Sequence, residues 1–201
     1  MAWVDYWVVE NPRNMAVVSR LDSVVFVTSN DHKAEEVASI LGIEVLRVSI
    51  DLPEIQSLSV EEVVILKAQA AFQVLGKPLV VEDTSLIIPA LNGLPGPLVK
   101  WFLQTIAAEG IAAMLQPGKS RAATAQSCFG LVDETGKVEL FLGEVTGEIA
   151  LKPAGKTGFG WDSIFIPTGS TETFAEMGDQ AKNKISHRYH ALQKLRKYLY
   201  A

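Results

Sequence analysis

Short apolar runs alternate along the chain with longer segments in which apolar residues recur every three or four positions. Runs of the first kind indicate buried strands, and segments of the second kind indicate amphipathic helices. We expect a first strand at 24–27, a turn at 28–32, and then a helix that begins at Lys33 and ends before Gly42. A second strand is expected at 43–50.

A second helix is predicted in the middle of the chain. Ser59-Val60-Glu61-Glu62 has the form of a capping box, so the helix begins there and ends before Gly76. Lys67 falls inside its apolar stripe, so the stem of this lysine starts from the packed face, and simple snorkelling to water is the alternative to a functional role. The expected stripe consists of Val60, Val63, Val64, Ala70, Ala71 and Val74.

The run Leu79-Val80-Val81-Glu82-Asp83-Thr84 predicts a buried strand that delivers two adjacent carboxylates at its carboxyl end. Open α/β sheets bind ligands at that end of their strands. Two neighbouring carboxylates repel each other, so such a pair persists most easily where a divalent cation or a proton compensates it. A polar cap on the strand is the alternative.

The second half of the chain predicts a helix, a hairpin-like region and a final helix. Rigid Gly and Pro residues at 93–97 precede an amphipathic helix that contains Trp101, Phe102 and Ile106. Residues 122–150 are typical of an antiparallel meander with a turn at 134–137, and the last helix is expected from Ser186 to Leu199. Together these elements predict an α/β protein with an elongated, mixed sheet flanked by helices.

Composition places the chain among ordinary globular proteins. With 201 residues and 48% apolar content it can bury a substantial core, and residues 23–201 are expected to form one domain after an N-terminal extension, residues 1–22, of unknown role. A formal charge of -5 argues against polymeric nucleic acid as a partner. No apolar run is long enough for a membrane span or a signal peptide, so we expect a cytoplasmic protein.

Several motifs can be assigned or dismissed on their chemistry. Gly155-Lys156-Thr157 imitates the end of a phosphate-binding loop, but Ala150 stands where the first glycine is required and no helix follows. Cys128 lies in an apolar context and is interpreted as a buried hydrophobic residue. Three histidines and one cysteine cannot make a closed zinc site without acids, and the acids themselves suggest Mg²⁺.

Two further segments indicate a nucleotide site. Gly158-Phe159-Gly160-Trp161-Asp162 places flexible glycines around two aromatic residues, which suits stacking on a planar base, although core aromatics in a turn are the alternative. Lysines and an arginine in 182–188 surround the start of the last helix, where cations oppose the helix dipole. A bound anion would resolve that conflict.

At this point the chain resembles the Ham1-like inosine triphosphate pyrophosphatases over about residues 23–200. The departures from the family pattern are Ser29, where glycine is usual, and Leu98, where an aromatic residue is usual. The matching blocks, in chain order, are residues 28–36, 51–56, 81–84, 94–97, 100–102, 158–162, 173–177 and 186–188.

The resemblance implies a two-lobed α/β fold with the active-site cleft between the lobes, and Mg²⁺-dependent hydrolysis of ITP, dITP and XTP to the monophosphate and pyrophosphate. It implies that Glu54 and Glu82 hold Mg²⁺ and that Asp83 is the general base. The substrate-binding residues that it implies are Thr28, Asn30, Lys33, Lys67 and Lys100 around the phosphates, Phe159, Gly160 and Trp161 beside the purine, and Asp162, Lys182, Ser186, His187 and Arg188 around the base and sugar.

Two alternatives remain open at the level of sequence. A Maf-like pyrophosphatase with another nucleotide preference would share the architecture, and a non-catalytic nucleotide sensor would share the basic and aromatic residues. A homodimer is also expected, from the resemblance and because the apolar residues of the 122–150 meander suggest surface that the subunit does not bury. The residues concerned are Phe129, Leu131, Leu140, Phe141 and Leu142.

Overall fold

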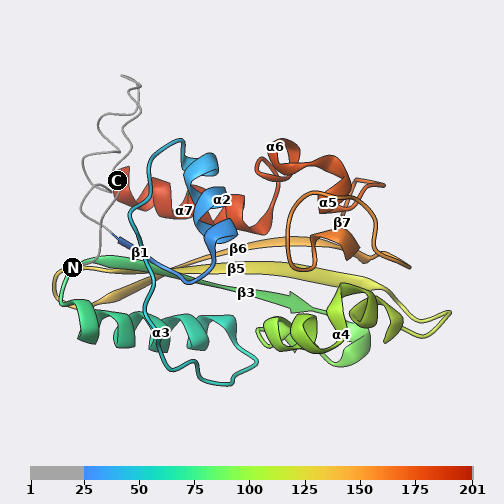
Figure 1. Ribbon diagram of the computed structural model, residues 1–201, viewed down its shortest axis with the longest axis horizontal. Coiled ribbons are helices and arrows are strands. Elements are labelled where there is room, and N and C mark those ends of the chain that lie inside the picture. Colours follow the sequence, from blue (N-terminus) through green and yellow to red (C-terminus); the bar gives the residue numbers. More distant parts are fainter. Residues whose placement is uncertain (1–24, 201) are drawn as a thin grey trace.

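The computed structural model describes residues 25–200, and the N-terminal extension at residues 1–22 lies outside them. The described chain forms a seven-stranded open sheet in the order β2-β1-β3-β5-β6-β7, with β4 paired to β3 (Figure 1). The strands are β1 Val25–Val27, β2 Arg47–Val48, β3 Leu79–Ile87, β4 Pro95–Gly96, β5 Ala122–Val132, β6 Val138–Ile149 and β7 Phe165–Pro167. The helices are α2 Asp31–Leu41, α3 Val60–Leu75, α4 Val99–Ala113, α5 Phe174–Met177, α6 Asp179–Lys182 and α7 His187–Tyr200, with short 3-10 turns η1 Pro89–Leu91 and η2 Asp162–Ile164.

The sheet is mixed, as predicted. Strand β1 runs parallel to β2 and β3, whereas β3, β5, β6 and β7 pair in antiparallel fashion. The predicted meander is the long hairpin of β5 and β6, which turns where Asp133 accepts backbone hydrogen bonds from Thr135 and Lys137. None of the helices between residues 25 and 200 is long and apolar enough to cross a bilayer.

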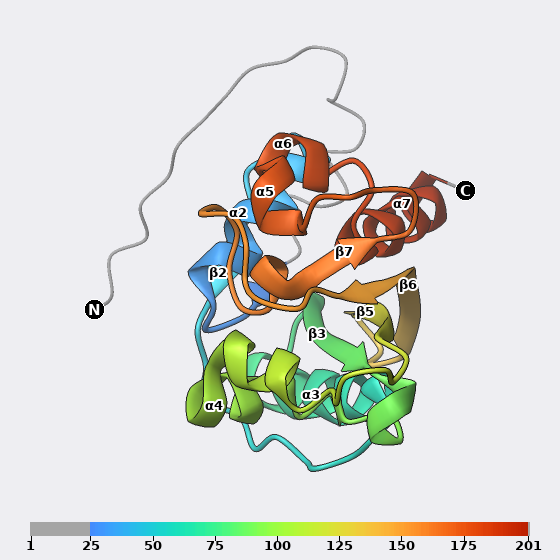
Figure 2. The same ribbon diagram turned by 90° about the vertical axis from the view of Figure 1, so that its right-hand side faces the viewer.

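Helices cover both faces of the sheet. Figures 1 and 2 show α3 and α4 on one face, and α2, α5, α6 and α7 on the other. On the first face Val64 and Ala68 of α3 pack against the sheet, and on the second Leu192 of α7 packs near Phe26 and Phe129. A third apolar cluster, which includes residues of α4, η2 and α5, closes the far end of the sheet.

Caps fix the ends of the two helices that border the site. Helix α2 begins at Asp31, two residues earlier than predicted, because the Asn30 side chain accepts a hydrogen bond from the Lys33 backbone. Ser59 caps α3 in the same way, but the other half of the predicted capping box is not formed, because the Ser59 backbone N–H donates to Ser57 Oγ and not to Glu62. Both helices end at a glycine in the left-handed conformation, Gly42 and Gly76.

Three details of the predicted elements are wrong. The second strand has only two residues, Arg47 and Val48, because it lies at the edge of the sheet and pairs only with β1. Val74 is 62% exposed, and Ala68 instead completes the buried face of α3. Helix α4 is interrupted at Ala107, whose positive φ no pattern of apolar residues could signal.

The meander also differs from the expectation of spare apolar surface. Phe129 is fully buried, and Leu131 and Phe141 are at most 8% exposed, because α7 covers this part of the hairpin. The helix approaches closely at Gly143, where a Cβ atom would stand 2.2 Å from the backbone oxygen of His187. Glycine at this position therefore lets the first turn of α7, which carries Arg188, reach the sheet.

Candidate active site

A cavity of about 580 Å³ opens between the two helical layers, lined by the start of α2, residues of α3, β3 and α4, and loops before α3 and after β6. Fourteen of the sixteen predicted site residues line it, and Glu82 and Ser186 do not. The lining residues among the predicted set are Thr28, Asn30, Lys33, Glu54, Lys67, Asp83, Lys100, Phe159, Gly160, Trp161, Asp162, Lys182, His187 and Arg188.

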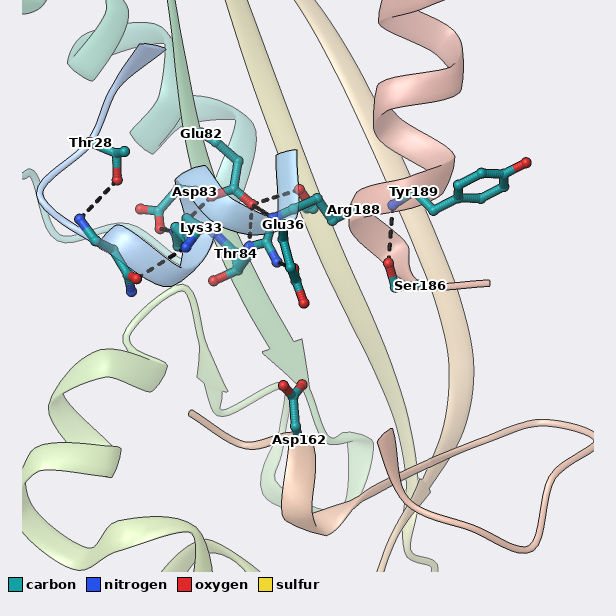
Figure 3. Close-up of polar contacts among 12 residues, drawn as sticks. Thr28, Lys33, Glu36, Glu82, Asp83, Thr84, Asp162, Ser186, Arg188 and Tyr189 are labelled. Carbon is teal, nitrogen blue, oxygen red and sulfur yellow. Dashed lines mark hydrogen bonds and ion pairs between the residues drawn. The ribbon is translucent and has the colours of Figure 1, made fainter. Parts of the chain in front are cut away.

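The side chains of the two adjacent acids of β3 lie in different surroundings. Side chains alternate across a strand, so Glu82 shares a face with Val80, which packs in the α7 cluster, and Asp83 shares a face with Val81, which packs against α3. Glu82 therefore points towards Arg188, while Asp83 opens into the cavity (Figure 3). The two carboxylates thus have different neighbours, but Lys33 Nζ lies within reach of both, at 2.8 Å from Glu82 and 3.7 Å from Asp83.

Glu82 is the buried partner of two cations. Its Oε1 accepts hydrogen bonds from Ser127 Oγ at 2.8 Å and from Arg188 Nη2 at 2.8 Å, and its Oε2 lies 2.8 Å from Lys33 Nζ. Burial raises the pKa of Glu82, but Arg188 and Lys33 outweigh that effect and hold the pKa well below its usual range. The charge repulsion expected between the paired acids is thus compensated by protein cations, whereas the role of Glu82 as a metal ligand stays a prediction.

Asp83 faces the cavity next to a lysine. Its Oδ1 accepts the backbone N–H of Thr84 at 2.8 Å and lies 3.7 Å from Lys33 Nζ. Lys33 stands in the first turn of α2, directly after the loop in which the Asn30 backbone donates to Thr28 Oγ1. The helix start, the lysine and the carboxylate therefore form one polar corner of the cavity (Figure 3).

Glu54 lies beside two more lysines of the cavity wall. Lys67 Nζ lies 3.4 Å from one oxygen of Glu54, and Lys100 Nζ lies 3.5 Å from the other. Burial raises the pKa of Glu54, but Lys67 and Lys100 lower it more, so the pKa stays below its ordinary value. Lys67 also donates to the backbone oxygen of Glu82, which gives this stripe lysine a partner inside the site.

Sequence patterns did not indicate Glu36 as a site residue. In the structure Glu36 pairs with Lys182 and Arg188, and Arg188 in turn pairs with Glu82 of β3. Glu36 is buried on α2 and makes short ion pairs with both Lys182 and Arg188. Burial raises its pKa, and the two cations lower it below the ordinary value. Its position beside Val37 on a helix face gave no signal, because a buried glutamate and a solvated one look alike in sequence.

Asp162 is the third buried acid in this network of ion pairs. Its Oδ2 lies 2.6 Å from Lys182 Nζ and accepts the Phe159 backbone N–H at 2.8 Å. Burial raises the pKa of Asp162, while Lys182 opposes the rise. The carboxylate thus fixes both the lysine and the aromatic loop.

His187 and Trp161 lie side by side in the wall of the cavity. Their ring centroids are 5.0 Å apart, and both residues are buried. Burial and the neighbouring Arg188 and Lys182 lower the pKa of His187 well below its ordinary value, so the imidazole is neutral at pH 7. Its Nδ1 is buried without a hydrogen-bond partner among the described residues.

Ser186 has a helix-capping contact. Its Oγ accepts the backbone N–H of Tyr189 at 3.1 Å in the first turn of α7, and the side chain is buried (Figure 3). Contact between Ser186 and substrate stays a prediction.

Comparisons with known proteins show the family of this chain. The Ham1 family model matches residues 24–198. The chain belongs to the Ham1 family. It is similar to the inosine triphosphate pyrophosphatase of Schizosaccharomyces pombe, with 46% identity over 89% of this chain and 96% of the relative. It is also similar to the dITP/XTP pyrophosphatase of Methanopyrus kandleri, with 44% identity over 85% and 93% of the two chains.

A solved structure supports the fold of this Ham1 family member. The Staphylococcus aureus Ham1 protein superposes with a TM-score of 0.76 at 27% identity, covering 87% of this chain and 97% of the other. Membership of the Ham1 family decides against the Maf-like alternative. Both departures from the family pattern, Ser29 and Leu98, line the cavity.

The structure also describes Cys128 and residues 155–157, neither of which was assigned to the site from the sequence. Cys128 is buried, and burial raises the pKa of its thiol to about 12, so the thiol is neither a nucleophile nor a metal ligand. Gly155 to Thr157 lie in the loop after β6, and Lys156 is exposed, so these residues do not form a phosphate-binding loop at a helix start.

The cavity residues fit a magnesium ion that the substrate helps to hold. Within residues 25–200, no group of three or more His, Cys, Asp or Glu side chains could hold a metal alone. Mg²⁺ is usually bound through one or two carboxylates together with substrate phosphates. Glu54 and Asp83 offer such hard oxygen donors on the cavity wall, next to the lysines that would accompany the phosphates.

Proposed function

We propose that this protein hydrolyses ITP, dITP and XTP to the corresponding monophosphate and pyrophosphate, and so removes deaminated purine nucleotides from the nucleotide pool. The observation that carries the proposal is a single cavity with three lysines and two carboxylates at one end and aromatic, buried polar residues at the other. Relatives named inosine triphosphate and dITP/XTP pyrophosphatase support the same activity.

The lysine end suits the triphosphate. Lys33, Lys67 and Lys100 bring three positive charges to the cavity, and the start of α2 adds backbone N–H groups that favour anions. In the protein alone these lysines pair with Glu54, Glu82 and Asp83. Phosphate oxygens would take over part of this pairing, which frees carboxylate oxygens for the metal.

Asp83 is the residue placed to activate water. Its carboxylate opens into the cavity and is held by the Thr84 backbone, so it can accept a proton from a water molecule that attacks the phosphate chain. Glu54 and Asp83, with Glu82 behind them, would hold Mg²⁺, which supplies charge stabilisation at the phosphates. Asp83 is the catalytic residue of the proposal.

The base end suits a 6-oxo purine. Two of the three Lys182 ammonium hydrogens and three of the five Arg188 guanidinium hydrogens are used within the described chain, which leaves donors of both residues for a ligand. A 6-oxo group accepts such donors, whereas the amino group of adenine leaves them unpaired. Each unpaired buried donor costs about 1–3 kcal/mol, so two contacts give discrimination on the order of a hundredfold or more.

The test is product analysis with a panel of nucleoside triphosphates and Mg²⁺. We expect ITP to give inosine monophosphate and pyrophosphate, with no release of single phosphate, and we expect a chelator to stop the reaction. The remaining alternative, a nucleotide sensor, predicts binding of ITP without turnover. Release of phosphate in place of pyrophosphate would contradict the proposed reaction.

A further inference from the structure

An exposed histidine of α2 stacks on the aromatic residue of the base end. The rings of His32 and Phe159 are 5.3 Å apart between centroids and only 18° from parallel. Both residues line the cavity, and His32 directly precedes Lys33 in the first turn of α2. The stack therefore joins the phosphate end of the cavity to its base end.

The Phe159 ring lies in a loop flanked by glycines and is contacted by His32, Lys182 and Arg188, of which His32 alone stacks on it. Gly158 and Gly160 on either side have positive φ values and are exposed, and the Phe159 side chain is only half-buried. Asp162 holds the Phe159 backbone N–H and does not act on the ring. Lys182 Nζ lies 4.8 Å from the ring centroid, so a cation also contacts the ring that His32 stacks on.

We propose that His32 is a positioning residue for the nucleobase, which it orients through the ring of Phe159. This inference rests on the proposed function, in which Phe159 stacks on the purine. Stacking depends on the ring alone and every purine has a π-face, so His32 contributes equally to the binding of all purine nucleotides. Its effect on the preference for ITP over ATP should be small, because that preference depends on the donors of Lys182 and Arg188.

The experiment compares steady-state kinetics of the wild type, His32→Ala and His32→Phe with ITP and with ATP. An aromatic pair contributes enough for a change of about twofold to tenfold in binding. We expect His32→Ala to raise KM by that factor for both nucleotides, to change kcat less than twofold, and to leave the thermal midpoint unchanged. His32→Phe restores the stack and should return KM to the wild-type value.

Glu35→Gln is the matched control. Glu35 lies 3.5 Å from His32 Nδ1, is largely exposed and does not line the cavity, so an exposed pair of this kind contributes little. Its loss should leave KM unchanged. That result would show that the imidazole acts through its stack on Phe159 and not through its pair with Glu35.

The outcomes distinguish this inference from the proposed function. If the wild type cleaves ITP but His32→Ala has an unchanged or lower KM, the positioning role is overturned and the proposed function stands. Failure of His32→Phe to restore KM would also overturn it, because the ring would not be the active feature. A wild type that does not cleave ITP overturns the proposed function, and with it the role of His32.

Discussion

At the scale of single residues, Glu82 and Asp83 differ in their contacts, and the proposed chemistry rests on that difference. Glu82 is engaged with Arg188, Ser127 and Lys33, whereas the Asp83 carboxylate opens into the cavity. We predict that Asp83→Asn lowers kcat for ITP by roughly a hundredfold or more with little change in KM, because the substitution removes a base and keeps the shape.

Asp133→Asn is a suitable control for that substitution. Asp133 lies in the exposed turn between β5 and β6 and does not line the cavity, so its loss should not change turnover. Near-normal turnover in Asp83→Asn, measured as initial rates of pyrophosphate release, would remove Asp83 from the mechanism.

Arg188 combines recognition with stability. The family resemblance implied a substrate-binding role, and the structure adds that Arg188 is 1% exposed and pairs with two buried acids, Glu36 and Glu82. We predict that Arg188→Ala lowers the free energy of unfolding by about 3–5 kcal/mol, because two buried carboxylates lose their partner. Chemical denaturation checks this value, and a loss below about 1 kcal/mol would contradict the buried network.

The neutral, buried His187 predicts a pH dependence of stability. Its pKa in the folded protein is lowered below the unfolded value of about 6.5, so the unfolded state binds a proton first as the pH falls. The contribution is fully present above about pH 6.5 and is lost on acidification, by up to about 1.4 kcal/mol per pH unit. Glu82 and Glu36, whose pKa values are also lowered, act in the same direction below about pH 4.5.

Denaturation curves from pH 7.5 to 5 should show this loss in the wild type. His187→Gln cannot take up the proton, so its stability should be flat between about pH 6.5 and 5. A wild type that is equally stable at both ends of this range would contradict the neutral buried state of His187.

At the scale of elements, the start of α2 ties helix stability to substrate binding. We predict that Asn30→Ala lowers the free energy of unfolding by about 0.5–2 kcal/mol, because the cap on the Lys33 backbone is lost. It should also raise KM for ITP, since Lys33 and the N–H groups of the first turn face the cavity.

Ser59→Ala offers a matched comparison, because Ser59 caps α3 in the same way but lies outside the cavity. The two variants should lose similar stability in urea denaturation, and only Asn30→Ala should change KM. Equal KM values in both variants would show that the α2 cap has a purely structural role.

Local patterns predicted most elements because those elements depend on local chemistry. The α3 boundaries follow from Ser59 and Gly76, and the β5 and β6 hairpin follows from its β-prone runs. The length of β2 and the exposure of Val74 depend on which partner covers them, which a linear pattern does not contain.

The same distinction applies to the candidate site. The acidic pair of β3, Lys67 and the glycine-aromatic loop were predicted from local patterns, and the family resemblance implied the roles of these residues. The different neighbours of Glu82 and Asp83 follow from strand alternation together with contacts to distant residues, which the sequence does not contain. Glu36 and His32 were missed because their roles come from contacts across the chain, with Arg188 and with Phe159.

At the scale of the whole molecule, the homodimer stays a prediction that rests on family resemblance. Of the hairpin residues offered as spare apolar surface, Phe129, Leu131 and Phe141 are buried within the subunit, and only Leu140 and Leu142 are half-buried. Light scattering at micromolar concentration should give twice the 21.9 kDa mass of one chain. A mass near 21.9 kDa would contradict the dimer.

The central claim is that one cavity joins triphosphate hydrolysis to recognition of a 6-oxo purine. Its most direct test is the ratio of kcat/KM for ITP to that for ATP, measured by pyrophosphate release with Mg²⁺. The unpaired donors that adenine leaves predict a ratio on the order of a hundred or more. A ratio near one would contradict the assignment of Lys182 and Arg188 to base recognition.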